Sequence, residues 1–356
     1  MIDPESRSLE WIEQASDLIP NIADNALVEK AIRALSLLES LVRSGCPFIF
    51  KGGTALMLHL GTSRRLSIDV DIVCPPGTDI RKYLGQYGNE YGFTEIKEIE
   101  RNSRTGVPKS HAEYRYVVTC PSGRPVDKIL LDVLYEDIHY SEVVSIPIES
   151  PLLKQIGAPT IVQCPSLKDM LGDKLTAFAP HTTGIPFYKN EDECFMEIMK
   201  QLYDVSSIID KINDLTEVRK TYSEIVPIEL GYRRMDHLTE SDVLTDTYNC
   251  AMNICYRGAI NKTEFGYYAD GARRVNSFII PENYNVDIAI RDAAKVAYLV
   301  RMIQTGCNQV KHYAPKMDEE LATALIQNQH LNKLNRIKKI SLEAFFYLLE
   351  IEKIAE

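Results

Sequence analysis

Two aspartates spaced two residues apart, Asp69 and Asp71, are the side chains in this sequence best suited to chemistry. Polar and apolar residues alternate over residues 66–73, which predicts a β-strand with one polar face. Neighbouring carboxylates on one face repel each other unless a cation lies between them. Mg²⁺, or Mn²⁺ in its place, prefers such oxygen ligands and keeps water or substrate phosphates as its other ligands. The pair therefore predicts a metal site, the alternative being a solvated strand face.

A glycine pair upstream of the aspartates is suited to binding phosphate. Gly52 and Gly53 follow a short apolar stretch at 48–50 and precede a predicted helix at 54–60. Backbone N–H groups at such a turn, together with the positive end of the helix dipole, attract phosphate oxygens. The pair matches neither the dinucleotide-binding G-x-G-x-x-G pattern nor the P-loop. With the aspartates, it predicts a site for a nucleoside triphosphate and magnesium.

A third carboxylate, Asp132, lies within the apolar stretch at 129–134. Phosphoryl-transfer sites with two metal ions use a further acid to bind metal or to accept the proton of the attacking hydroxyl. Asp132 is the candidate for this role, with Asp127, Glu136 and Asp137 as nearby competitors. The alternative is an acid on an edge strand that faces water.

Together these motifs resemble the nucleotidyltransferase superfamily of DNA polymerase beta. The segment at 51–56, with the spacing Arg65-x-Ser67-x-Asp69-x-Asp71, is more specifically similar to AbiEii/AbiGii-type toxin nucleotidyltransferases. Residues 173–177 resemble the Lys-Leu-x-Ala helix of that family, and residues 200–205 resemble its Arg-Asp-Leu-Tyr-Asp-Leu segment. The resemblance covers about residues 48–208. Residues 181–193 depart from the family, because they lack its arginine and could form either a lid or a plain connection.

The resemblance implies roles residue by residue. The metal would be held by Asp69, Asp71 and Asp132, which with Lys174 form the implied catalytic set. Nucleotide binding would fall to Gly52, Gly53, Thr54, Arg65, Ser67, Lys174 and Asp204. From the residues alone, Lys174 could equally extend from a helix surface, and Asp204 could be a surface acid.

The implied activity is transfer of a nucleoside monophosphate from a triphosphate to a hydroxyl, with release of pyrophosphate. The resemblance further implies a toxin that modifies tRNA 3′ ends and has a cognate antitoxin as partner. An antibiotic or protein hydroxyl is the alternative acceptor, and a non-catalytic nucleotide-binding module is the alternative class of protein.

The elements that would position these residues fall into two parts. We expect a mixed α/β nucleotidyltransferase core with N-terminal helices over residues 1–180 and an α-helical domain over 181–356. Apolar spacing predicts core helices at 5–18, 23–44, 54–60, 79–91 and 166–179, and core strands at 48–50, 66–73, 93–100, 112–120, 127–136 and 143–149. Later helices are expected near 191–211, 214–226, 239–260, 284–306, 317–328 and 341–354.

Composition limits the partners of the chain. Its 356 residues carry 40 basic and 50 acidic side chains, so the net charge of −10 excludes affinity for nucleic acid through bulk charge. Residues 251–356 nevertheless carry a net +2, with a basic cluster at residues 330–339 as a possible RNA contact or a solvated face. No apolar run is long enough for a membrane helix, so we expect a cytoplasmic protein. The eight cysteines show no disulfide or zinc spacing and are expected to be reduced thiols.

Overall fold

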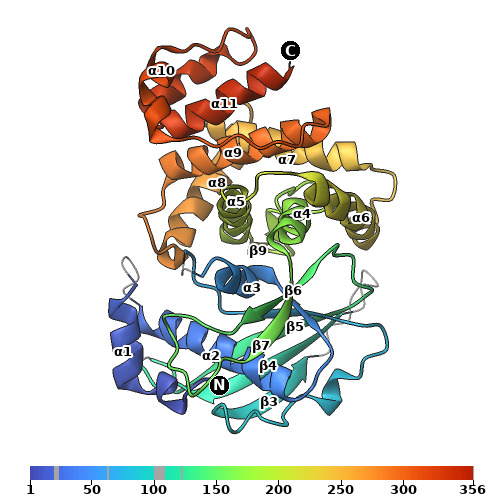
Figure 1. Ribbon diagram of the computed structural model, residues 1–356, viewed down its shortest axis with the longest axis vertical. Helices are drawn as coiled ribbons and strands as arrows, with labels where there is room; N and C mark the ends of the chain where they lie inside the picture. Colours follow the sequence, from blue (N-terminus) through green and yellow to red (C-terminus); the bar gives the residue numbers. More distant parts are fainter. Residues whose placement is uncertain (20–23, 62–63, 100–108, 122, 356) are drawn as a thin grey trace. The chain divides into compact units, whose positions relative to one another are not determined.

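The computed structural model describes residues 1–19, 24–61, 64–99, 109–121 and 123–355, which form two compact units (Figure 1). The first unit comprises Met1–Ser166 and Ser277–Asn283, and the second comprises Leu167–Asn276 and Tyr284–Glu356. The predicted helix start at residue 23 and strand end at residue 100 lie outside the described residues. Within the described residues, no helix combines the length and apolarity needed to span a membrane.

A five-stranded mixed sheet forms the centre of the first unit. Its spatial order is β1-β2-β5-β4-β3, with β2 and β5 parallel and the other neighbours antiparallel. Within β2 and β5 the apolar residues Val70, Ile72 and Leu131 are buried, which anchors the sheet in its core. The strands span Ile49–Lys51 (β1), Val70–Cys74 (β2), Phe93–Ile99 (β3), Lys109–Val117 (β4) and Val126–Tyr135 (β5). The mixed α/β core is therefore confirmed.

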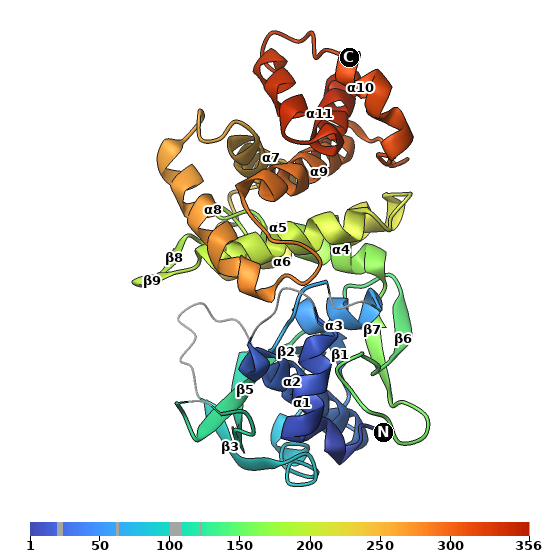
Figure 2. The same ribbon diagram turned by 90° about the vertical axis from the view of Figure 1, so that its left-hand side faces the viewer.

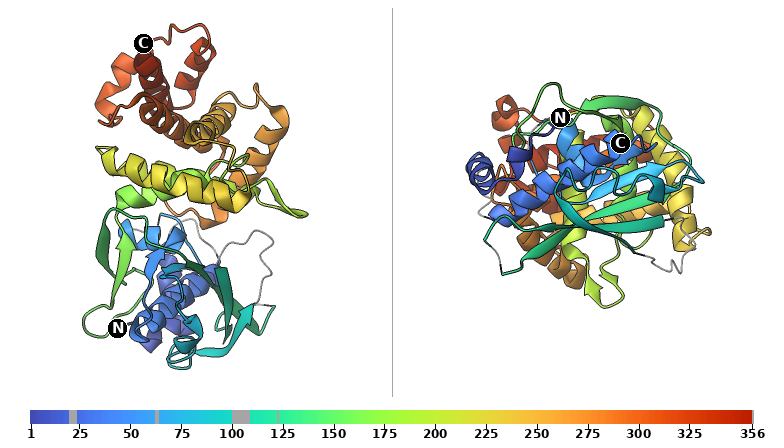
Figure 3. Two further views of the ribbon diagram at one scale, coloured as in Figure 1. Left: turned by 90° about the vertical axis from the view of Figure 1, so that its right-hand side faces the viewer. Right: turned by 90° about the horizontal axis from the view of Figure 1, so that it is seen from below.

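Helices and a hairpin complete this unit. Helix α1 (Leu9–Asp17) packs on α2 (Asn25–Arg43), and α2 lies along one face of the sheet against β2 and β5 (Figure 3). Helix α3 (Gly52–His59) follows β1 directly. The strands β6 (Val143–Pro147) and β7 (Ile161–Pro165) pair in an antiparallel hairpin, with β7 beside β1. The sequence patterns did not predict β7.

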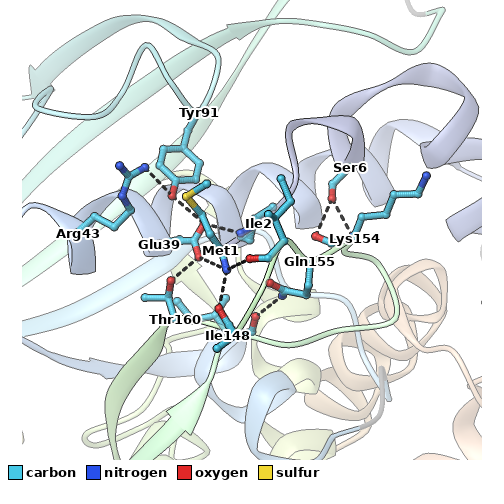
Figure 4. Close-up of polar contacts among 12 residues, drawn as sticks. Met1, Ile2, Ser6, Glu39, Arg43, Tyr91, Ile148, Lys154, Gln155 and Thr160 are labelled. Carbon is cyan, nitrogen blue, oxygen red and sulfur yellow. Dashed lines mark hydrogen bonds and ion pairs between the residues drawn. The ribbon is translucent and has the colours of Figure 1, made fainter.

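A buried carboxylate fastens α2 to the loops around it (Figure 4). Glu39 of α2 accepts hydrogen bonds from the Ile2 amide at 2.8 Å and from the Tyr91 hydroxyl at 2.7 Å, and also from the Thr160 hydroxyl. Arg43, one turn further along α2, donates to the same tyrosine oxygen at 3.2 Å. These three donors replace hydrogen bonds that water would give to Glu39, so the carboxylate can be buried at this position.

Two predicted elements of the first unit are wrong. The helix expected at 79–91 is only a 3₁₀ turn at Ile80–Lys82 followed by turns, because Gly85 and Gly92 adopt positive φ angles of 85° and 78°. The strand expected at 66–73 begins only at Val70. Residues 64–66 pair instead with a segment from far along the chain. The Leu66 amide donates to Phe278, and the Ile280 amide donates to Arg64.

The second unit is helical, as predicted for the C-terminal region. Helix α4 packs on α5 and α6, α5 packs on α8 and α9, and α9 packs on α7 and α11 (Figure 2). The helices span Leu167–Ala177 (α4), Phe195–Ile209 (α5), Thr216–Arg233 (α6), Glu240–Cys255 (α7), Lys262–Val275 (α8), Val286–Thr305 (α9), Asp318–Thr323 (α10) and Leu342–Ala355 (α11). Helix α8 was not predicted, and α10 is shorter than the helix expected at 317–328.

The contacts assign α4 to this second unit. The predicted division into a nucleotidyltransferase core at 1–180 and a helical domain at 181–356 stays a prediction, since it concerns which residues bind the nucleotide. A short hairpin of β8 (Tyr188–Lys189) and β9 (Asp192–Glu193) lies between α4 and α5.

Candidate active site

The glycine that opens α3 lies directly against Asp71. Gly52 has a φ of 80°, and a Cβ atom placed on it would lie only 2.1 Å from the Asp71 Oδ2 atom. Lys51 and Asp71 are register partners where β1 pairs with β2, which brings the glycine turn to this carboxylate. Only glycine can combine this backbone conformation with this close approach. The structure thus brings together two motifs that lie nearly twenty positions apart in the sequence.

The second glycine lies against two polar side chains. A Cβ atom on Gly53 would lie 2.6 Å from Nη2 of Arg65 and 2.8 Å from Oγ of Ser67. The N-cap residue of α3, Lys51, makes no side-chain hydrogen bond to the start of the helix. The amide groups of the first helical turn, with the guanidinium and hydroxyl beside them, form a set of donors suited to phosphate oxygens.

Thr54 holds the backbone at the first aspartate. Its side chain is fully buried, and Oγ1 donates a hydrogen bond to the Asp69 carbonyl oxygen at 2.6 Å. Asp69 is exposed and precedes β2, whereas Asp71 lies within that strand and is half-buried. The predicted placement of both acids on one strand is therefore wrong. The Thr54 hydroxyl thus holds the backbone at Asp69, and its role in nucleotide binding stays a prediction.

Asp132 lies next to Asp71 across the sheet. The two residues are register partners in the parallel pairing of β2 with β5. On its other side, Asp132 pairs with His111 of β4, whose Nδ1 atom hydrogen-bonds to the Asp132 carboxylate. The sequence patterns did not reveal His111, because its only link to the motif is the register between β4 and β5. The side chain of Asp132 is 45% exposed, so a substrate can reach it.

The three carboxylates have the chemistry to bind a hard divalent cation together with oxygen atoms of the substrate. Asp71 fills the space over Gly52 that a Cβ atom would occupy, and its carboxylate, with those of Asp69 and Asp132, offers only oxygen donors. Among the described residues, the one group with three candidate ligand atoms within 4.8 Å of one another is His181, Asp246 and Cys250. The three predicted aspartates are not such a group among the described residues, so a metal held there would need further ligands from substrate phosphates or water.

Lys174 and Asp204, predicted separately, form an ion pair. The Lys174 Nζ atom of α4 lies 2.8 Å from Oδ2 of Asp204 on α5, and both side chains are buried. The surface positions considered for both residues are therefore wrong. A buried pair of this kind holds each charge in a fixed direction, and losing one partner leaves the other unpaired in the interior.

The segment at 181–193 is anchored by its first residue. The imidazole of His181 lies between two carboxylates. Its Nδ1 atom is 2.7 Å from Oδ1 of Asp246, and its Nε2 atom is 3.1 Å from Oε1 of Glu264. The hydrogen bond with Asp246, opposed in part by burial, raises the pKa of His181 to about 9. Glu191, Asp192 and Glu193 are exposed, and Glu193 pairs with Arg274. The two alternatives for residues 181–193, a lid over the nucleotide or a plain connection, both stay predictions.

Several basic side chains of the second unit serve the fold itself. Arg233 donates to the Gly184 carbonyl at 2.7 Å and Arg336 to the Tyr256 carbonyl at 2.9 Å, while Lys338 donates to carbonyls of the 322–324 segment. All eight cysteines are free, and six of them are buried. The basic cluster at 330–339 is thus partly used for packing.

Known proteins similar to the chain were found by family and by structure. None of the curated proteins matches the chain. A presumed nucleotidyltransferase from H. pylori, solved as a crystal structure, is similar in structure with a TM-score of 0.43 and 13% identity. The similarity covers 80% of this chain and 97% of that one. The family model described as nucleotidyl transferase AbiEii toxin, Type IV TA system, matches residues 33–241, more than half of the sequence. The chain therefore belongs to the AbiEii nucleotidyltransferase toxin family.

Proposed function

We propose that this nucleotidyltransferase moves a nucleoside monophosphate from a nucleoside triphosphate to a hydroxyl of an RNA, in a magnesium-dependent reaction. The observation that carries the proposal is the Asp71 carboxylate seated on Gly52, with Arg65 and Ser67 seated on Gly53. This arrangement puts a carboxylate next to a set of hydrogen-bond donors suited to phosphate oxygens. Family membership supports the nucleotide as substrate, a toxin role and an antitoxin partner.

The chemistry assigns one task to each group. The amides of α3, Arg65 and Ser67 would bind the triphosphate, and Asp69 and Asp71 would hold the metal, with Asp132 as a third ligand or as proton acceptor. Magnesium, when bound, neutralises phosphate charge and polarises the α-phosphorus. Asp132, held by His111, would take the proton of the attacking hydroxyl. A new P–O bond then forms at the α-phosphorus, the α–β bridging bond breaks, and pyrophosphate leaves with the electron pair.

Lys174 and Asp204 are proposed as nucleotide-binding residues on the family pattern. The tRNA 3′ end is proposed as acceptor on the resemblance of the sequence motifs alone, since the description of the matching family names a type IV toxin and no acceptor. Mn²⁺ is expected to replace Mg²⁺ in the reaction, because it accepts the same oxygen ligands.

The test is transfer of label from each of four α-labelled triphosphates to RNA. The purified full chain with Mg²⁺ and total RNA is expected to label a tRNA-sized band, and EDTA is expected to abolish the label. Asp71→Asn should reduce labelling by at least about 10³-fold, since one metal-binding charge is lost. Asp79→Asn, which alters an exposed acid of the same unit, should label like the wild type.

Parallel reactions offer an aminoglycoside and a total protein extract as acceptors. Labelling of either one in place of RNA would keep the transferase activity but reject the RNA acceptor. Equal absence of label from the wild type and Asp71→Asn with every nucleotide and acceptor would reject the proposed activity.

A further inference from the structure

The second unit holds a cluster of different character from the carboxylates of the first. His181 follows α4, while Asp246 and Cys250 stand one turn apart on α7 and so share a face of that helix. One candidate ligand atom from each residue lies within 4.8 Å of the other two. A nitrogen, an oxygen and a sulfur ligand converge here from two segments that are more than sixty positions apart.

The distances among these three atoms approach those of a metal coordination shell. Nδ1 of His181 lies 2.7 Å from Oδ1 of Asp246 and 3.8 Å from Sγ of Cys250, and Sγ lies 3.4 Å from Oδ1. Ligands of tetrahedral zinc, at the usual bond lengths, stand about 3.4–3.6 Å from each other. The sulfur distances already match within a few tenths of an ångström, and only the hydrogen-bonded nitrogen and oxygen must move apart.

Neighbouring groups form hydrogen bonds that orient the side chains of His181 and Asp246. Glu264 of α8 lies 3.1 Å from Nε2 of His181, so the ring can donate its other proton to a carboxylate while Nδ1 faces the cluster. The second oxygen of Asp246 accepts hydrogen bonds from the His181 amide at 3.0 Å and the Thr182 hydroxyl at 2.9 Å. Both contacts fix the side chains and leave Oδ1 and Nδ1 directed at Cys250.

From this geometry we infer that His181, Asp246 and Cys250 form a binding site for a divalent transition metal, with zinc as the ion that best fits the three donors. The thiolate and imidazole exclude magnesium, which prefers oxygen, so the site is distinct from that of the aspartates. Three protein ligands leave one position for water, and the imidazole is 48% exposed, so an ion can enter from solvent.

Binding would join the segment after α4 to α7. Asp246 is 6% exposed and Cys250 is buried, so these two ligands belong to the packed face of the helix. An ion bound to them and to His181 replaces the proton that Asp246 and His181 share. The consequence is a cross-link within the second unit that acts through coordination instead of a disulfide.

Cobalt spectroscopy and native mass spectrometry test this site in the full chain. All samples carry Cys307→Ser, which removes the exposed thiol as a source of background. After metal removal with EDTA and dialysis under reducing conditions, Co²⁺ should give a thiolate charge-transfer band that saturates at about one equivalent. Zn²⁺ should abolish this band by displacement, add one zinc to the native mass, and raise Tm.

Matched variants assign the ligands. Cys250→Ser should lose the charge-transfer band, while Cys255→Ala, which changes a buried thiol one turn along the same helix, should keep it. His181→Gln, which retains a polar side chain at a half-exposed position, should weaken binding by at least about tenfold and remove the Tm shift. Absence of both the cobalt band and the zinc adduct in the folded parent protein would overturn the inference. A band of unchanged intensity in Cys250→Ser would overturn it as well.

Discussion

At the scale of single residues, the close contact between Gly52 and Asp71 is the most sensitive point of the candidate active site. Gly52→Ala forces a Cβ atom into the space that the Asp71 carboxylate occupies at 2.1 Å. The carboxylate must move by an ångström or more, and displacements of that size cost about 10²-fold in rate. We therefore expect kcat for nucleotide transfer to fall by about 10²-fold, measured with a labelled triphosphate at saturating substrate.

Gly45→Ala is the control for backbone strain. Gly45 has a comparable φ of 74° but nothing within 4 Å of its would-be Cβ atom. Both variants should lose about 1–2 kcal/mol of stability from the left-handed conformation. Only Gly52→Ala should lose activity, and equal kinetics for the two variants would contradict the role of the contact.

His111 is the residue-scale feature that the motifs did not contain. It bonds to Asp132, and removing such a support of an active-site carboxylate costs about 10–100-fold in activity. We expect His111→Ala to lower kcat in this range with little change in KM for the triphosphate. Ser110→Ala, which removes the neighbouring hydroxyl bonded to Tyr135, should leave kcat unchanged. A rise in KM at constant kcat would instead place His111 in nucleotide binding.

At the scale of elements, α3 fixes the start of β2 through a single hydroxyl. Thr54→Val keeps the shape of the side chain but removes the hydroxyl that donates to the Asp69 carbonyl. Loss of such a hydrogen bond costs about 0.5–1.5 kcal/mol, so chemical denaturation should show a loss of that size together with lower transfer activity. Thr54→Ser retains the hydroxyl and should recover most of both. A fully active, fully stable Thr54→Val protein would show that Asp69 is positioned by other contacts.

Local patterns predicted the elements whose signals are local. The Asp-x-Asp spacing and the glycine pair identified the candidate site, because each motif lies within a few residues. The pairing of Asp71 with Asp132, the contact of His111 and the β7 strand depend on strand register between distant segments. The helix predicted at 79–91 is wrong, because the chain takes a positive φ at Gly85 within that range. Helix α8 was not predicted, and it contains two glycines, Gly266 and Gly271, which lower the helix propensity of its sequence.

At the scale of the whole molecule, ion pairs in the last helix tie stability to pH. Burial disfavours the charge on Glu350, but hydrogen bonds from Lys311 and Lys353, each 2.7 Å long, outweigh it and lower its pKa. A carboxyl whose pKa is lowered by folding adds stability above its unfolded value of about 4.3, and this contribution disappears as pH falls through the folded value.

Glu350→Gln should therefore reduce the free energy of unfolding at pH 7 by about 1–3 kcal/mol. Between pH 5 and pH 3 the difference from wild type should shrink, measured by urea unfolding at each pH. Glu319→Gln, at an exposed position of α10, should follow the wild type throughout. A difference that stays constant over the acid range would contradict the assigned pairing.

The net negative charge of the molecule is compatible with its candidate activity, because the activity depends on a few side chains at one site. Three of the acids that make the chain negative are the proposed metal-binding aspartates. Several arginines and lysines of the second unit donate hydrogen bonds to backbone carbonyls, so part of their donor capacity is used within the fold. Composition argues against attraction of nucleic acid through bulk charge, but it does not reveal which basic groups hold the fold together.

The pairing of residues 64–66 with residues 278–280 sets the order in which a growing chain can be completed. A ribosome delivers Arg65 and Ser67 more than 200 residues before the segment that pairs beside them. During that interval residues 64–66 are without the backbone hydrogen bonds that residues 278–280 supply. Full assembly of the candidate active site must therefore wait until most of the protein has been synthesised, which limits how early a nascent chain can carry out nucleotide transfer.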